Sequence, residues 1–247
     1  MYPCKTMEGR INLKSQFFKG FYHGIPIALG YLSVSFGFGI MTMKAGISAL
    51  SAVGISLSNL TSAGQVAGVG VIAAGGTIVE IILTQIIINL RYSLMGISLS
   101  QKLSDNFSFP KRLIAAHGIT DEIFAVAISQ KEVTASYMYG LMSLPILGWS
   151  LGTLLGALFG QLLPESISNA LGIMLYAMFV ATIVPGSRKE KSVLVCVITA
   201  AVLSVGVKYI IPSLSGGFSV IICSCISAAF CALVFPRKDE EGEGDVK

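Results

Sequence analysis

Long stretches of the sequence carry no Asp, Glu, Lys or Arg. The longest, residues 45–79, is flanked by Lys44 and Glu80. A helix needs about 20 consecutive apolar residues to cross roughly 30 Å of hydrocarbon. Four prolines, Pro164, Pro185, Pro212 and Pro236, each lie at the end of such a stretch, as expected for helix boundaries. The pattern therefore predicts membrane-spanning helices over 21–43, 77–100, 134–163, 167–185, 192–211 and 214–235.

Two further apolar stretches do not fit a simple span. Residues 47–76 are too many for one perpendicular helix and too few for two helices with a loop, and polar residues occupy 59–65. Residues 113–130 are interrupted by a polar segment over 117–122. Irregular backbone inside a membrane is tolerated only where protein or water covers it. The predicted fold class is all-α, a polytopic transmembrane helix bundle with six full spans plus two broken or re-entrant segments. Seven or eight full helices are the alternative.

Composition supports this class. The chain is 53% hydrophobic and 12% charged with a mean hydropathy of +0.77, whereas soluble domains carry roughly 25% charged residues. The net charge of +4 is small and the basic residues are scattered, so no nucleic-acid partner is expected. The five cysteines form no paired framework, which gives no disulfide or metal site. Hydrolase, kinase and zinc-protease motifs are absent, so neither an enzyme nor a cofactor is expected.

The distribution of Lys and Arg predicts the orientation. With a cytoplasmic N-terminus and both partial segments returning to their own side, 14 of the 17 basic residues lie inside. Lys44 and Lys208 lie outside and Arg91 lies within the membrane, in agreement with the positive-inside rule. We therefore expect a multi-pass membrane protein with both termini in the cytoplasm. Its parts are a cytoplasmic segment over 1–20, one transmembrane domain over 21–235 and an acidic disordered tail over 236–247.

The predicted helix over 77–100 has a polar side. Glu80 and Arg91 share one stripe of it, while Asn89 and Tyr92 lie on a neighbouring stripe. An ionisable side chain within a membrane usually faces the bundle interior and marks function. Arg91 either meets a carboxylate, from a substrate or another helix, or extends to the cytoplasmic surface. Glu80 is either interfacial or functional.

The break around residues 59–65 is the second candidate region. The N-terminus of a half-helix suits a carboxylate, and exposed carbonyl groups suit an ammonium or a cation. A glycine-rich packing helix is the alternative. The substrate-binding candidates from both regions are Asn59, Ser62, Gly64, Gln65, Asn89, Arg91 and Tyr92.

Acidic residues mark the third region, which follows Thr120. They are either the first turn of a capped helix or carboxylates for a substrate ammonium or a coupling proton. The proton-coupling candidates are Asp121, which is preferred, Glu122 and Glu80.

Glycines recur at every fourth position in the predicted helix 134–163. The stripe, which consists of Gly148, Gly152, Gly156 and Gly160, allows another helix to approach closely. That partner helix belongs either to the same chain or to a separate membrane subunit.

Several segments together resemble the AzlC/YgaZ family, the large subunit of branched-chain amino acid exporters. They are GIPIALGY at 24–31, FGFG at 36–39, SAGQ at 62–65, NLRYSLM at 89–95 and TDEIF at 120–124. The resemblance covers about residues 18–235. It implies a small hydrophobic AzlD-type membrane subunit as partner and valine, leucine, isoleucine and methionine as substrates.

The function predicted from these features is a secondary transporter subunit of the lipid bilayer that exports branched-chain amino acids, coupled to protons. A channel-type pore and a non-transporting membrane scaffold subunit are the alternatives. A channel requires a continuous wet pathway. A scaffold requires that Arg91 and Asp121 be replaceable without loss of function.

Overall fold

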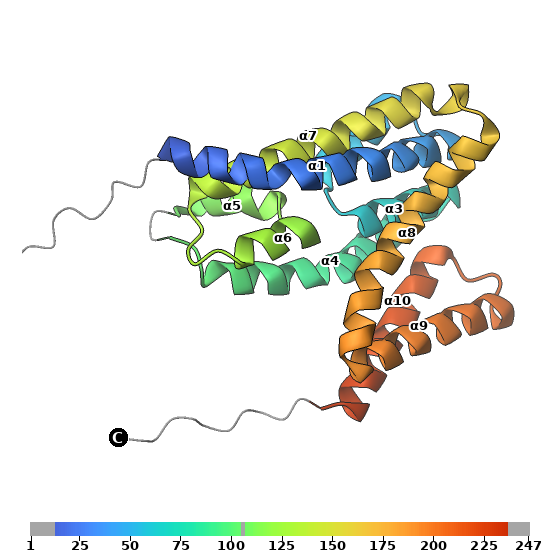
Figure 1. Cartoon of the computed structure of the whole chain (residues 1–247). Coiled ribbons are helices and arrows are strands. Elements are labelled where there is room, and N and C mark those ends of the chain that lie inside the picture. Colours follow the sequence, from blue (N-terminus) through green and yellow to red (C-terminus); the bar gives the residue numbers. More distant parts are fainter. Residues whose placement is uncertain (1–12, 105–106, 237–247) are drawn as a thin grey trace, which may run out of the picture.

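The computed structural model describes residues 13–104 and 107–236, and within them the regular elements are all helices (Figure 1), with one isolated β-bridge between Leu103 and Val133. The long helices are α1 (Leu13–Lys44), α4 (Ile78–Ser100), α7 (Ala135–Phe159), α8 (Glu165–Lys189), α9 (Lys191–Ile210) and α10 (Gly216–Val234). The short ones are α2 (Ala49–Ser58), α3 (Ser62–Ala73), α5 (Phe109–His117), α6 (Asp121–Ile128) and the 3₁₀ turn η1 (Gly160–Leu162). The predicted all-α membrane helix bundle is confirmed.

Five described helices, α1, α4, α7, α9 and α10, are long and apolar enough to cross a membrane. They match five of the predicted spans, and the sixth, 167–185, lies within α8. Helix α1 begins at Leu13, eight residues before the predicted span. The predicted acidic tail lies outside the described residues, apart from Pro236.

Both predicted breaks are present, and both segments are re-entrant. In Figure 1, α1 ends and α4 begins at the same end of the bundle, so α2 and α3 form a hairpin that enters and leaves from that end. Helix α4 ends and α7 begins at the opposite end, so α5 and α6 form the second hairpin. Gly75 has a φ of 69° in the turn from α3 to α4, a conformation that glycine adopts without strain.

Helices α1 and α7 form the most closely packed pair. Cβ atoms placed on Gly148 and Gly156 of α7 would lie 2.7 Å from the Ala28 carbonyl oxygen and 2.8 Å from the Phe36 carbonyl carbon. Later positions of α7 face later positions of α1, so the two helices run parallel. Glycine alone permits this approach, because any side chain would separate the backbones.

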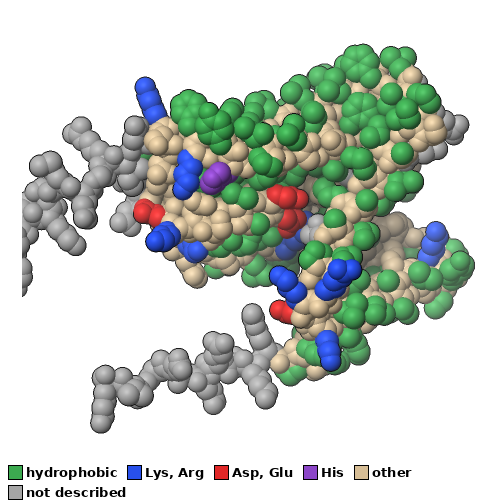
Figure 2. Space-filling view, viewed as in Figure 1, with side chains coloured by type: hydrophobic (Ala, Val, Ile, Leu, Met, Phe, Trp, Pro, Cys, Tyr) green, Lys and Arg blue, Asp and Glu red, His purple; other side chains and the backbone are tan. Residues whose placement is uncertain are grey.

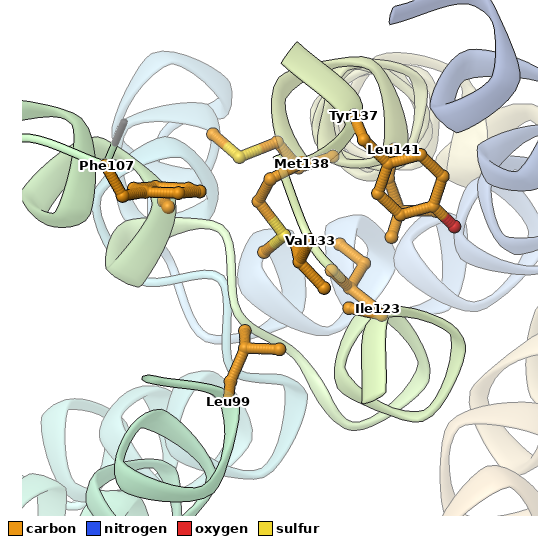
Figure 3. Close-up of a cluster of buried hydrophobic side chains, with 10 residues drawn as sticks. Leu99, Phe107, Ile123, Val133, Tyr137, Met138 and Leu141 are labelled. Atoms are coloured by element: carbon orange, nitrogen blue, oxygen red, sulfur yellow. The ribbon is translucent and has the colours of Figure 1, made fainter. Parts of the chain in front are cut away.

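Apolar packing holds the second hairpin against this pair. Ile123 of α6 is fully buried in one cluster with Val133 and Leu141, which belong to the start of α7 and the residues before it (Figure 3). Leu99 at the end of α4 belongs to the same cluster. The outward faces of the long helices instead carry exposed apolar side chains, and hydrophobic side chains are spread widely over the face shown in Figure 2. Such surfaces suit contact with lipid.

Gly156→Ala should destabilise the protein, because the new methyl group would push α7 away from α1. Overpacking of this kind costs about 1–3 kcal/mol. Gly206→Ala is the matched control, since no atom lies within 4 Å of its Cβ position. Thermal unfolding in detergent should show a lower midpoint for Gly156→Ala only. Equal midpoints for both variants would contradict the close helix contact.

Candidate functional site

The two helix breaks meet inside the bundle. The Nε2 atom of His117, at the end of α5, lies 3.0 Å from the carbonyl oxygen of Leu57 near the end of α2. Beyond each break, a threonine caps the next half-helix. The Thr61 hydroxyl accepts the Gly64 N–H at 3.1 Å, and the Thr120 hydroxyl accepts the Ile123 N–H at 3.3 Å. The N-terminal ends of α3 and α6 therefore come together from opposite ends of the bundle.

A small pocket lies where these two N-terminal ends meet. Its lining includes Leu60 and Ser62 from the first break and Thr120, Asp121 and Glu122 from the second. The remaining lining residues are Tyr31, Tyr92, Trp149 and Met178. The cavity measures about 10 Å³, which is room for about one water molecule. The pocket in this conformation is therefore closed to any ligand of amino-acid size.

An ion pair adjoins the pocket and joins α4 to α6. Nη1 of Arg91 lies 2.9 Å from Oδ2 of Asp121, and the two side chains are 40% and 27% exposed. Nη2 of Arg91 donates to the Tyr92 hydroxyl at 3.2 Å, and the guanidinium lies 5.0 Å from the centre of that ring. Of the predicted alternatives for Arg91, the structure thus shows a carboxylate partner on another helix.

Tyr31 of α1 contacts the other acid of this motif. Its hydroxyl lies 2.6 Å from the Thr120 hydroxyl and within hydrogen-bonding distance of Oε2 of Glu122. The Tyr31 ring also contacts Trp149 of α7 edge-to-face, with ring centres 5.2 Å apart. These contacts place α6 relative to the closely packed pair of α1 and α7.

Amide side chains hold the first break. Gln85 of α4 donates to the Gly64 carbonyl at 2.7 Å and accepts from Asn59 at 3.0 Å and Asn89 at 3.1 Å. Gln65, 1% exposed, donates to the Asn59 carbonyl and accepts from the Trp149 indole at 3.0 Å. These bonds satisfy polar groups that a broken helix would otherwise leave unpaired.

Most of the predicted site residues thus fall into two groups. Ser62, Tyr92, Asp121 and Glu122 line the pocket, and Arg91 adjoins it. Asn59, Gly64, Gln65 and Asn89 belong to the amide network that supports the break.

Glu80 is separate from both groups. It lies 11 residues before Arg91 in α4, about 16 Å along the helix. It is 3% exposed and accepts hydrogen bonds from the Ser215 hydroxyl and, at 3.0 Å, from the Gly217 N–H. The carboxylate therefore meets the N-terminus of α10, where the helix dipole favours a negative charge. Glu80 is thus buried within the protein near the first turn of α4, and its two predicted roles, interfacial or functional, stay predictions.

The glycine stripe of α7 packs within the chain. Gly148, Gly152, Gly156 and Gly160 all face α1. The intrachain alternative is therefore the correct one, and a separate subunit would need another surface.

Sequence reasoning assigned no role to Tyr31 and Trp149, although both line the pocket. Trp149 is the one tryptophan of the chain and lies in a glycine-rich apolar stretch, which was the available signal. Tyr31 likewise lies in a segment of apolar and small residues. The sequence around these two residues does not indicate which helix break their polar atoms contact.

The arrangement suits a zwitterion. A guanidinium and two half-helix N-termini offer partners for a carboxylate, and two carboxylates offer partners for an ammonium. Within the described part of the chain, no three His, Cys, Asp or Glu residues lie together as a metal site would require.

Comparisons with known proteins agree with this picture. The family model described as AzlC protein matches residues 26–163. The inner membrane protein YgaZ of Escherichia coli strain K12 is 28% identical over 233 residues, which covers 91% of this chain and 94% of the relative. An uncharacterized membrane protein of Archaeoglobus fulgidus is 30% identical over 180 residues and covers 72% of this chain and 79% of the relative. No solved structure matches the chain significantly.

Gln65→Leu should destabilise the protein more than Arg91→Ala. It leaves the Trp149 indole and the Asn59 carbonyl unpaired, at about 1–3 kcal/mol for each buried group. The Arg91 ion pair is partly exposed, and such pairs contribute about 1 kcal/mol or less. Chemical unfolding in detergent measures the free energy of unfolding of both variants. The reverse order would show that the ion pair, and not the amide network, supports the fold.

Proposed function

The chain belongs to the AzlC family, and from this premise we propose that it exports branched-chain amino acids as the large subunit of a secondary transporter. Membership of this family and the similarity to YgaZ support a transport-related function in a membrane. The proposed substrates are valine, leucine, isoleucine and methionine. Their export involves no covalent chemistry, so the protein is not an enzyme.

One observation carries the proposal, namely the meeting of two oppositely oriented re-entrant hairpins at one pocket. Secondary transporters commonly bind substrate near the middle of the membrane at discontinuous helices, whose half-helix N-termini face anionic groups. The N-terminal ends of α3 and α6 supply this arrangement here. Movement of one hairpin would open the pocket to one side of the membrane, and movement of the other to the opposite side.

The Arg91–Asp121 ion pair provides partners for both charged ends of an amino acid. A substrate that enters between the two side chains would place its carboxylate on Arg91 and its ammonium on Asp121. Substrate entry leaves the net charge of the site unchanged, because the single Arg91–Asp121 ion pair is replaced by two ion pairs with the zwitterion. A guanidinium binds a carboxylate through two parallel hydrogen bonds, which favours Arg over Lys at this position.

Apolar groups beside the ion pair suit an aliphatic side chain. Leu60, Trp149 and Met178 line the same pocket as Asp121. In an apolar pocket, one methylene group changes the relative binding free energy of two substrates by about 1–3 kcal/mol, so several aliphatic amino acids should compete. Because the cavity is much smaller than any of them, the hairpins must separate before substrate enters.

The proposed energy source is the proton gradient across a prokaryotic plasma membrane. One elementary charge that crosses 100 mV releases about 2.3 kcal/mol, which can drive export against a gradient. We also propose that a small hydrophobic subunit of the AzlD type binds an exposed apolar face, since the glycine stripe of α7 is occupied by α1.

Efflux from preloaded cells tests the function. Cells that make the chain together with the small subunit should release labelled leucine faster than cells that make neither, and unlabelled valine, isoleucine and methionine should compete. Arg91→Ala should reduce the efflux to the level of cells without the protein. Arg91→Lys should recover little of it, because the ammonium lacks the bidentate geometry.

Arg188→Ala is the matched control, because Arg188 is an exposed cation at the end of α8. It should leave efflux unchanged. Normal efflux by Arg91→Ala, at equal amounts in the membrane, would contradict the role of Arg91 in binding.

The proposed orientation has its own test. The exposed Lys44 and Lys208 should react with an impermeant amine reagent in intact cells, whereas the exposed Lys131 and Lys189 should react only after permeabilisation. Lys102 is a poor reporter, because its ammonium donates to the Ile128 carbonyl at 2.6 Å. Labelling of Lys131 from outside would reverse the orientation.

A further inference from the structure

Resting on the proposed export function, we infer that Glu122 carries the coupling proton and that Tyr31 and Thr120 form a hydrogen-bond chain that follows its protonation. Asp121 then serves the substrate ammonium. Glu122 alternately holds a proton and faces that ammonium, which makes the protein a proton–amino acid antiporter.

The charges around the pocket support this division. Three charged side chains meet there, namely Arg91, Asp121 and Glu122. Arg91 forms its ion pair with Asp121, and no described Lys or Arg forms one with Glu122. The site therefore holds one carboxylate more than it holds cations. The Tyr31 hydroxyl and the N-terminus of α6 stabilise Glu122 in part. A carboxylate without a cationic partner is still costly in a membrane, and a proton or an ammonium removes that cost.

Every element packed around Glu122 presents an identifiable group. Helix α1 presents the Tyr31 hydroxyl, α4 presents Arg91 and Tyr92, and α6 itself presents Asp121. Helices α7 and α8 present Trp149 and Met178, which do not titrate. The first break and the start of α3 present Leu60 and Ser62, which carry no charge. Tyrosine, with an ordinary pKa of about 10, keeps its proton near neutrality, and arginine stays charged. The two carboxylates are therefore the groups that can exchange a proton, and one of them is already paired.

The direction of the hydrogen bonds next to Glu122 depends on whether its carboxyl group is ionised. Tyr31 has one hydroxyl hydrogen but contacts both the Thr120 hydroxyl and Glu122. With Glu122 ionised, Thr120 donates to Tyr31 and Tyr31 donates to Glu122. With Glu122 protonated, the new O–H can donate to Tyr31, and Tyr31 can donate to Thr120. The chain reverses, and the Thr120 hydrogen becomes available to another acceptor at the N-terminus of α6.

The proton cycle is balanced. An O–H bond forms on Glu122 with a proton from the outer solution and breaks toward the cytoplasm, while the carboxylate alternates between minus one and zero. Asp121 holds the substrate ammonium in either state, and ionised Glu122 strengthens that binding, so a proton on Glu122 favours release of the substrate. Inward proton movement would then drive outward amino acid movement.

Inside-out membrane vesicles test the assignment, since export appears in them as uptake of labelled leucine. Two rates are measured: accumulation driven by an acidic lumen, and exchange of labelled for unlabelled leucine at equal pH. Glu122→Gln should retain exchange and lose pH-driven accumulation to the level of vesicles without the protein. Asp121→Asn should lose both rates. Glu132→Gln, an exposed carboxylate outside the site, is the matched control and should retain both.

Tyr31→Phe provides a second variant that keeps the titratable carboxylate. Without the Tyr31 hydroxyl the hydrogen-bond chain from Glu122 to Thr120 is broken, so the pH profile of accumulation should differ from that of the unchanged chain. Two results would overturn the assignment to Glu122. They are leucine accumulation driven by the pH gradient in Glu122→Gln, and an unchanged pH profile of accumulation in Tyr31→Phe. Absence of leucine exchange by the unchanged chain would instead overturn the proposed function, so the two failures are distinct.

Discussion

Backbone groups at a helix break cannot remain unpaired inside a membrane, and this constraint organises the centre of the protein. Lipid offers no hydrogen bonds, so each free N–H or C=O costs several kcal/mol. The two hairpins meet the requirement with side chains. Thr61 and Thr120 accept the first N–H groups of α3 and α6, while Gln65 and Gln85 donate to carbonyl groups of the first break. The polar residues that the breaks require are also those that surround the pocket.

The parallel pair α1 and α7 gives these hairpins a fixed reference. Its glycines allow the two backbones to touch, which leaves few ways for the helices to slide or rotate. From this pair, Tyr31 reaches the start of α6 and Trp149 reaches the start of α3. Each hairpin is therefore held both by the pair and by α4. The first hairpin depends on neutral amides and the second on charged groups, so pH and an ionic ligand act mainly on the second.

The two groups of polar residues also differ in burial. Gln65 is fully buried and its bonds have fixed partners, as expected for a structural group. Arg91 and Asp121 are partly exposed and bind each other beside a cavity of about 10 Å³. This difference suits the proposed transport cycle, in which Arg91 and Asp121 exchange partners and so cannot be held as tightly as groups that only support the fold. Glu80, buried against the N-terminus of α10, follows the structural pattern.

The sequence by itself determined the helical class, the positions of the spans and the existence of both breaks, because each depends on local composition. Charge-free stretches specify spans, and polar residues at 59–65 and 117–122 interrupt them. Which residues meet depended on the tertiary structure. The approach of His117 to Leu57, the pairing of Arg91 with Asp121 and the contact of Tyr31 with Glu122 join segments 30 to 91 residues apart. The glycine stripe shows the same limit, since its spacing indicated a helix partner and only packing identified α1. Periodicity reports the face of a helix, whereas the partner of that face depends on how all helices pack together.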